Sequence, residues 1–147
     1  MHSDCTFTTS RASWIFTSNP AARCLQGQDD YADSMSSCLI EAMGAKHVSI
    51  TGFGHIDGRS SSIVAQDLGY IFNPTAWRPG LVSLLDCTRL TLRDVTFTDS
   101  PHWTVHLIGC EGVLTNGIHN YNSLKMPNCD GIAPDHCRNV RISDCHI

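Results

Sequence analysis

Residues Thr104–Asn120 read TVHLIGCEGVLTNGIHN, and this stretch decides the fold because three other segments fall into register with it. Apolar residues alternate within each segment, as at Leu90 and Leu92, which is typical of a strand with one buried face. The alternation changes phase at Gly117, a residue type that tolerates left-handed backbone. We therefore expect each segment to form a strand, a corner and a second strand.

The matching segments share an anchor position and the same apolar positions around it. They are Leu39–Asp57 (LIEAMGAKHVSITGFGHID), Leu81–Phe97 (LVSLLDCTRLTLRDVTF) and Gly131–Ile147 (GIAPDHCRNVRISDCHI). The anchors are Ala45, Cys87, Cys110 and Cys137, and the last two intervals are 23 and 27 residues. The shared apolar positions hold Ile40, Val82, Val105 and Ile132, then Val48, Leu90, Val113 and Val140, then Phe53, Val95, Ile118 and Cys145. The expected corners are Gly52, Asp94, Gly117 and Asp144.

A repeat of this length buries little surface alone, so neighbouring repeats must stack. The pattern predicts an all-β fold, a right-handed parallel β-helix, with small side chains stacked at the cysteine anchors. Residues 1–147 are expected to form one incomplete domain, with stacked coils over 38–147 and a poorly assigned coil over 1–37. The first interval of 42 residues predicts an inserted loop near 60–79. A β-sandwich, which also has short alternating strands, is the competing architecture.

The composition excludes several classes of partner. The formal net charge is −4 and charged residues make up 16% of the chain, so no basic field exists to hold nucleic acid or a membrane surface. The eight cysteines lack the CxxC spacing of zinc sites, and we expect no metal or other cofactor. Neither a signal peptide nor a membrane span is visible.

Four stretches resemble glycoside hydrolase family 28, the polygalacturonases and their relatives, in order and in spacing. VSITGFGHIDG at 48–58 is similar to the family's ItGxGxIDG coil, and Arg78-Pro79 followed by 81–87 to its RPxlvxxxxc stretch. SPHWTVH at 100–106 resembles SPxWxxh, while NCDGI at 128–132 with NVRI at 139–142 resembles NxDGI…NVxI. The resemblance covers residues from about Ile40 to Ile147.

The resemblance implies inverting hydrolysis of α-1,4 bonds in pectic galacturonan, with a protonated acid at the leaving oxygen and a carboxylate that activates water. Carried over residue by residue, it implies that Asp130 is the water-activating carboxylate and that Asn128 is a substrate-binding or positioning group. The family's Gly-Asp-Asp, Gly-His-Gly and Arg-x-Lys elements would follow Ile147. We therefore expect this chain alone to be inactive, and the intact protein to be a monomeric extracellular or periplasmic enzyme acting on polygalacturonate.

Two other functions fit a solenoid of this kind. One is a non-catalytic polysaccharide-binding β-helix, such as an adhesin or tailspike part, because a fold does not determine a function. The other is a pectate-lyase-like enzyme, which would need clustered carboxylates for calcium and a catalytic arginine. Substrate-binding cations are expected downstream or near Arg59 and Arg78.

Simple residue chemistry gives further expectations for the site. Alternation from Ile132 places Asp130 on the inward side, so it reaches a groove only if Gly131 breaks the phase of the strand. Asp57 is expected to cap backbone amides, and Trp103 to pack at a coil corner. Histidines 102, 106, 136 and 146 are expected to be exposed or in loops. Cysteines 129 and 145 flank the candidate site, and a disulfide between them is left open.

Overall fold

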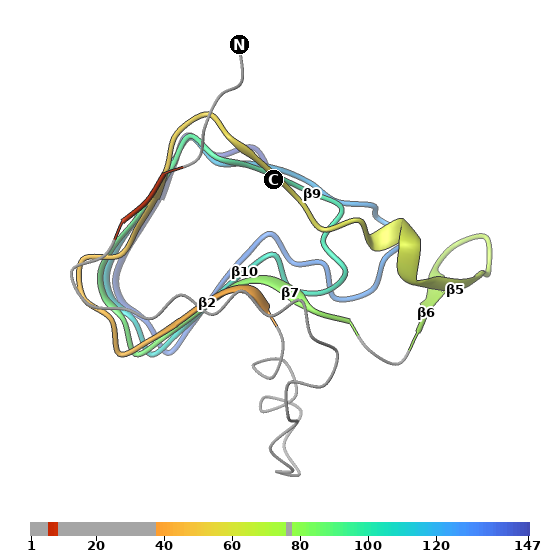
Figure 1. Ribbon diagram of the computed structural model, residues 1–147, viewed down its shortest axis with the longest axis horizontal. Helices are drawn as coiled ribbons and strands as arrows, with labels where there is room; N and C mark the ends of the chain where they lie inside the picture. The colour runs from red at the N-terminus through yellow and green to blue at the C-terminus, as the bar shows by residue number, and fades with distance from the viewer. Residues whose placement is uncertain (1–5, 9–37, 76–77) are drawn as a thin grey trace, which may run out of the picture.

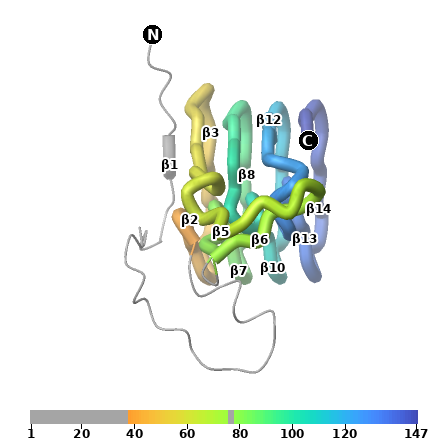
Figure 2. The backbone as a smooth tube through the Cα atoms, turned by 90° about the vertical axis from the view of Figure 1, so that its right-hand side faces the viewer, coloured from red at the N-terminus to blue at the C-terminus, as the bar shows by residue number. Residues whose placement is uncertain are grey.

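The protein is a solenoid in which successive coils stack along one axis, as the computed structural model shows (Figures 1 and 2). The structure describes residues 6–8, 38–75 and 78–147. Figure 1 looks along the stack, where three sheets enclose a core, and Figure 2 shows the coils side by side. The expected coil within residues 1–37 lies outside the described residues, apart from Thr6–Thr8.

Each wall of the solenoid is a sheet built from one strand of each coil. The first wall contains β2 (Cys38–Met43), β7 (Gly80–Leu85), β10 (Val105–Ile108) and β13 (Ile132–Asp135). The second contains β3 (Ser49–Thr51), β8 (Thr88–Arg93), β11 (Glu111–Asn116) and β14 (Arg138–Ser143), with β1 (Thr6–Thr8) antiparallel along β3. The third contains β4 (His55–Asp57), β9 (Thr96–Thr98) and β12 (His119–Tyr121).

Neighbouring coils pair in parallel, which confirms the β-helix and contradicts the β-sandwich. Val105 lies between Val82 and Ile132, and Val113 lies between Leu90 and Val140, as the repeat predicts. The position expected for Phe53 is wrong. Strand β4 pairs with β9 through His55–Thr96 and Ile56–Phe97, so Phe53 is one extra residue in the corner, and it is 75% exposed.

The corners are rows of left-handed residues. The predicted row has positive φ at all four positions: Gly52, Asp94, Gly117 and Asp144. Two further rows of left-handed residues were not predicted from the sequence. One contains Gly44, Asp86, Gly109 and His136, and the other contains His47, Arg89, Gly112 and Asn139. Within the first two rows glycine alternates with a larger residue, and a Cβ on Gly109 or Gly117 would meet the carboxylate of the aspartate on the preceding coil.

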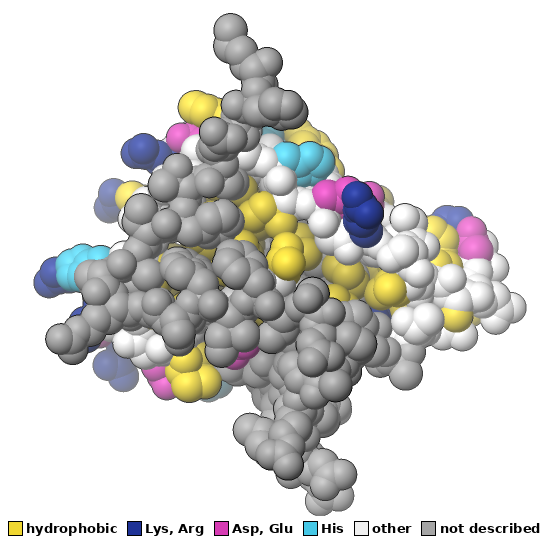
Figure 3. All heavy atoms as spheres, in the orientation of Figure 1, with side chains coloured by type: hydrophobic (Ala, Val, Ile, Leu, Met, Phe, Trp, Pro, Cys, Tyr) yellow, Lys and Arg dark blue, Asp and Glu magenta, His cyan; other side chains and the backbone are white. Residues whose placement is uncertain are grey.

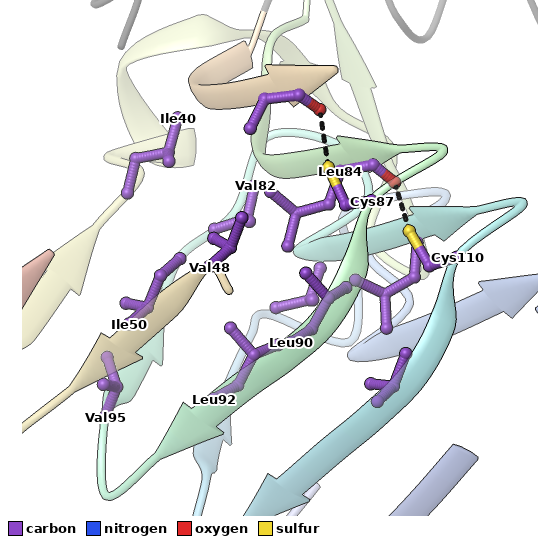
Figure 4. Close-up of a cluster of buried hydrophobic side chains, with 14 of the residues drawn as sticks. Ile40, Val48, Ile50, Val82, Leu84, Cys87, Leu90, Leu92, Val95 and Cys110 are labelled. Atoms are coloured by element: carbon purple, nitrogen blue, oxygen red, sulfur yellow. Dashed lines mark hydrogen bonds between the residues drawn. The ribbon is translucent and has the colours of Figure 1, made fainter. Parts of the chain in front are cut away.

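The core is a set of stacked apolar rows between the three sheets (Figure 4). Seen along the axis, hydrophobic side chains gather in the middle and charged side chains at the periphery (Figure 3). The cysteine anchors stack as predicted, but their thiols also form hydrogen bonds. Cys87 donates to the Ala42 carbonyl at 3.5 Å and Cys110 to the Leu84 carbonyl at 3.1 Å, each reaching the preceding coil. Sulfur therefore contributes more here than a small apolar group would.

The predicted insertion is a small structured unit outside the solenoid. It begins with the 3-10 helix η1 (Ser60–Ile63) and continues as an antiparallel hairpin of β5 (Val64–Asp67) and β6 (Phe72–Pro74). Figure 1 shows this hairpin projecting from the coils beside the loop that joins the third sheet to the first. The first coil thus places a hairpin next to a loop of a later coil.

Candidate active site

The candidate site lies where the chain enters the first sheet, on the outer side of that sheet. Outward positions of neighbouring strands line up there, with Ser83 between Glu41 and His106. Burial raises the pKa of the Glu41 carboxyl above its ordinary range. The outer face of this sheet is therefore polar and partly enclosed. Polar side chains of this kind are typical of a binding surface and not of a hydrophobic core.

Asp130 is exposed, because the chain bends at Gly131 before β13 begins. The backbone around it is fixed by two bonds to the preceding coil: the Thr104 amide donates to the Asp130 carbonyl at 2.9 Å, and the Val105 amide donates to the Gly131 carbonyl at 3.1 Å. A Cβ on Gly131 would lie 2.5 Å from the side-chain nitrogen of Asn120. The break in strand phase that the sequence required is present, and the carboxyl group of Asp130 is outside the core. Its catalytic role stays a prediction.

Asn128 is also exposed, and its side chain is held by an arginine from the insertion. Its backbone is left-handed, with φ of 57°. Arg78 donates one hydrogen bond to the Asn128 side-chain oxygen at 3.0 Å and another to the Pro127 carbonyl at 2.7 Å. The structure thus brings Asn128 and Arg78 together two residues before Asp130. The substrate-binding role of Asn128 stays a prediction.

Asn122 anchors the other end of the same loop, and sequence reasoning missed it. Its side-chain oxygen accepts from the Ser100 amide at 2.9 Å, and its side-chain nitrogen donates to Thr104 Oγ1 at 2.7 Å and to the Cys129 carbonyl at 3.0 Å. One amide therefore ties two coils and both ends of the loop 122–130. Asparagine is common in loops, so its residue type alone gave no signal.

A histidine, a tryptophan and a second histidine flank this loop. The expectation that all four histidines are exposed or in loops is wrong for His106, which lies in β10, is only 3% exposed and contacts Trp103 edge to face at 4.0 Å between ring centroids. Trp103 therefore packs, but on the outer face of the first sheet. Burial, with the nearby Arg78 charge, lowers the pKa of His102 to about 4, so this imidazole is neutral near pH 7.

Two smaller expectations are settled. The Asp57 side chain accepts a hydrogen bond from the Arg59 amide at 2.9 Å, which confirms the capping role. Cys129 and Cys145 are not joined, and both are free thiols. Cys129 instead donates to the Ser100 carbonyl at 2.8 Å, and burial raises the pKa of its thiol to about 11, so it stays protonated. The thiol therefore adds one more fixed contact beside Asp130.

The described part of the chain holds no helix long and apolar enough to cross a bilayer.

Comparison with known proteins places this geometry in a family. A probable polygalacturonase from Vitis vinifera is 35% identical over 123 residues, which cover 83% of this chain and 24% of that protein. A probable polygalacturonase from Arabidopsis thaliana is 31% identical over 98 residues, which cover 67% of this chain and 20% of that protein. The chain thus spans about a quarter or less of these relatives. No solved structure gives a significant match.

The family model described as glycosyl hydrolases family 28 matches residues 9–147, which is nearly the whole chain. The parallel coils, the exposed Asp130 at the bend and the matched motifs all lie within that range. The chain belongs to the glycosyl hydrolases of family 28.

Proposed function

We propose that this chain supplies one half of the active site of a hydrolase of pectic polysaccharide. Asp130 is the carboxylate that activates water, and Asn128 is a donor to the sugar. The observation that carries the proposal is the bend at Gly131, which turns a residue of inward parity out to solvent. The regular inter-coil ladder fixes the backbone on both sides of this bend, through the Thr104 and Val105 amides, so the carboxyl group is exposed on a held backbone.

The chemistry needs a second carboxyl group. Inverting hydrolysis requires one carboxylate to take a proton from water and one protonated acid to give a proton to the leaving oxygen, on opposite faces of the sugar. His102 is a poor substitute for that acid, because a pKa of about 4 leaves it without a proton to donate near neutral pH. The acid is expected in the Gly-Asp-Asp element that family members carry on the next coil.

Two measurements test the proposal. The 147-residue chain should release no reducing ends from polygalacturonate, and turnover comparable to that of intact family members would refute the need for a second carboxyl group. Trigalacturonate added to the ¹⁵N-labelled chain should shift the amide resonances of Asn128, Asp130 and Gly131. Maltotriose is the matched control, since it has the same type of linkage without carboxylates. Shifts confined to the third sheet would overturn the proposed site.

A further inference from the structure

The loop 122–130, which carries Asn128 and Asp130, is held from outside the solenoid by the inserted hairpin. Lys125 Nζ lies 3.1 Å from a carboxylate oxygen of Asp67 and 5.2 Å from the ring centroid of Phe72. The Phe72 amide also donates to the Lys125 carbonyl at 2.8 Å. These contacts join strands β5 and β6 to the middle of the loop, and Lys125 and Asp67 are 58 residues apart in sequence.

Arg78 makes a second attachment closer to the candidate carboxylate. Its guanidinium bonds to the Pro127 carbonyl and to the Asn128 side-chain oxygen, through two different terminal nitrogens. A planar guanidinium that meets two acceptors fixes both their separation and their orientation. The bond to Asn128 therefore also fixes the orientation of the side-chain amide, with its oxygen towards Arg78 and its nitrogen away from it.

The orientation of that amide matters for recognition. An asparagine side chain has an acceptor end and a donor end, and it can present either one. Because Arg78 takes the oxygen of Asn128, the NH₂ group is the end left for a ligand. The donor group suits a carboxylate or hydroxyl oxygen of a uronic acid unit.

We propose that Arg78 is a positioning residue, which together with hairpin β5–β6 holds the loop 122–130 and leaves the donor end of the exposed Asn128 side chain for a ligand. This positioning role adds to the expectation drawn from sequence, which was that cations near Arg59 and Arg78 bind the substrate. The two printed bonds use one N–H on each terminal nitrogen, so the other N–H groups of the guanidinium can meet a ligand while the loop contacts stay in place. The part of this inference that concerns Asn128 as a sugar donor rests on the proposed function; the part that concerns the loop does not.

The test compares hydrogen exchange in the 147-residue chain and its variants. The Met126 amide, which donates to the Ser123 carbonyl within the loop, and the Thr104 amide, which donates to the Asp130 carbonyl, report on the loop. Arg78→Met should speed their exchange by about tenfold, since two charge-assisted bonds are lost. Arg78→Lys should speed it less, because a lysine retains a charge and can reach one acceptor. Arg93→Met is the matched control, since Arg93 lies at the end of β8 and pairs with Asp94 at the following corner, away from the loop.

A second readout separates positioning from general stability. The side-chain NH₂ resonances of Asn128 should move in Arg78→Met and stay near their original position in Arg78→Lys, with amides of β8 and β11 unchanged in both. If Arg78→Met does not fold, Asp67→Asn, which weakens the hairpin contact, should still speed exchange at Met126. Exchange at Met126 that stays at the original rate in these variants overturns the proposal, and so does equal acceleration throughout the core. A chain that shows this exchange pattern but no trigalacturonate shifts would refute the proposed function alone.

Discussion

Replacing Asn122 by alanine should loosen the candidate site and destabilise the fold measurably. The side chain makes three hydrogen bonds, of 2.7, 2.9 and 3.0 Å, to Thr104, Ser100 and Cys129. Each is worth about 1 kcal/mol net, and a buried group left without a partner adds to the loss. Ser100 and Thr104 are both fully buried, so water does not readily replace the amide. We expect the free energy of unfolding to fall by about 3 kcal/mol.

Urea denaturation followed by circular dichroism measures this loss as a lower midpoint at constant slope. Asn73→Ala is the control, because Asn73 lies exposed in the hairpin. Asn122→Asp keeps the acceptor for the Ser100 amide but removes the donor end, so its loss should fall between those of the control and Asn122→Ala. A loss below about 1 kcal/mol for Asn122→Ala would refute the reasoning, since it would mean that one amide does not hold the loop.

Other perturbations test the core, the thiols and the site electrostatics. Phe97→Ala should lower the free energy of unfolding by about 3–5 kcal/mol, because Phe97 is fully buried. Phe53→Ala should lower it by less than about 0.5 kcal/mol, because Phe53 lies outside the core. Equal losses of stability for the two variants in urea denaturation would contradict the corrected register. Cys110→Ala should cost about 1 kcal/mol through the lost bond to the Leu84 carbonyl, and an unchanged thermal midpoint would contradict a stabilising role for this bond. The ring protons of His102 should titrate near pH 4, below the ordinary pKa of 6.5. Because the folded state favours the neutral ring, the contribution of His102 to the free energy of unfolding is complete above pH 6.5 and is lost as the pH falls to about 4. His102→Gln should flatten the stability profile in that window, and a midpoint near 6.5 in the original chain would show that the imidazole is solvated.

The repeat could be predicted because stacking forces equivalent residues into the same environment. Val82, Val105 and Ile132 are alike in sequence because they share one row of the core. Phe53 was misplaced because spacing from an anchor cannot reveal one added residue in a corner. The left-handed backbone of Arg89 was also missed, because arginine is not a residue type that favours a positive φ.

The candidate carboxylate was found from a motif, whereas the residues that hold it were not. Asp130 and Asn128 are close in sequence and match a family pattern. Arg78 and Asn122 act through contacts with residues that are remote in sequence or that belong to another coil, and these contacts exist only once the coils stack. His106 was expected to be exposed because histidine often is, but its neighbours in the sheet and Trp103 enclose it. The contacts that hold the candidate site therefore depend on the folded structure and could not be predicted from the composition.

The alternation of glycine and aspartate along one row of corners decides which coils of this solenoid can be copied. A coil copied directly onto itself would superpose Asp94 on Asp94, with two carboxylates one strand spacing apart and no glycine to make room. A copied pair of coils restores the order at once. Copying a single coil that carries an aspartate, by gene duplication or by design, should therefore need a compensating change at its corner, whereas copying the coil that carries Gly117 should not.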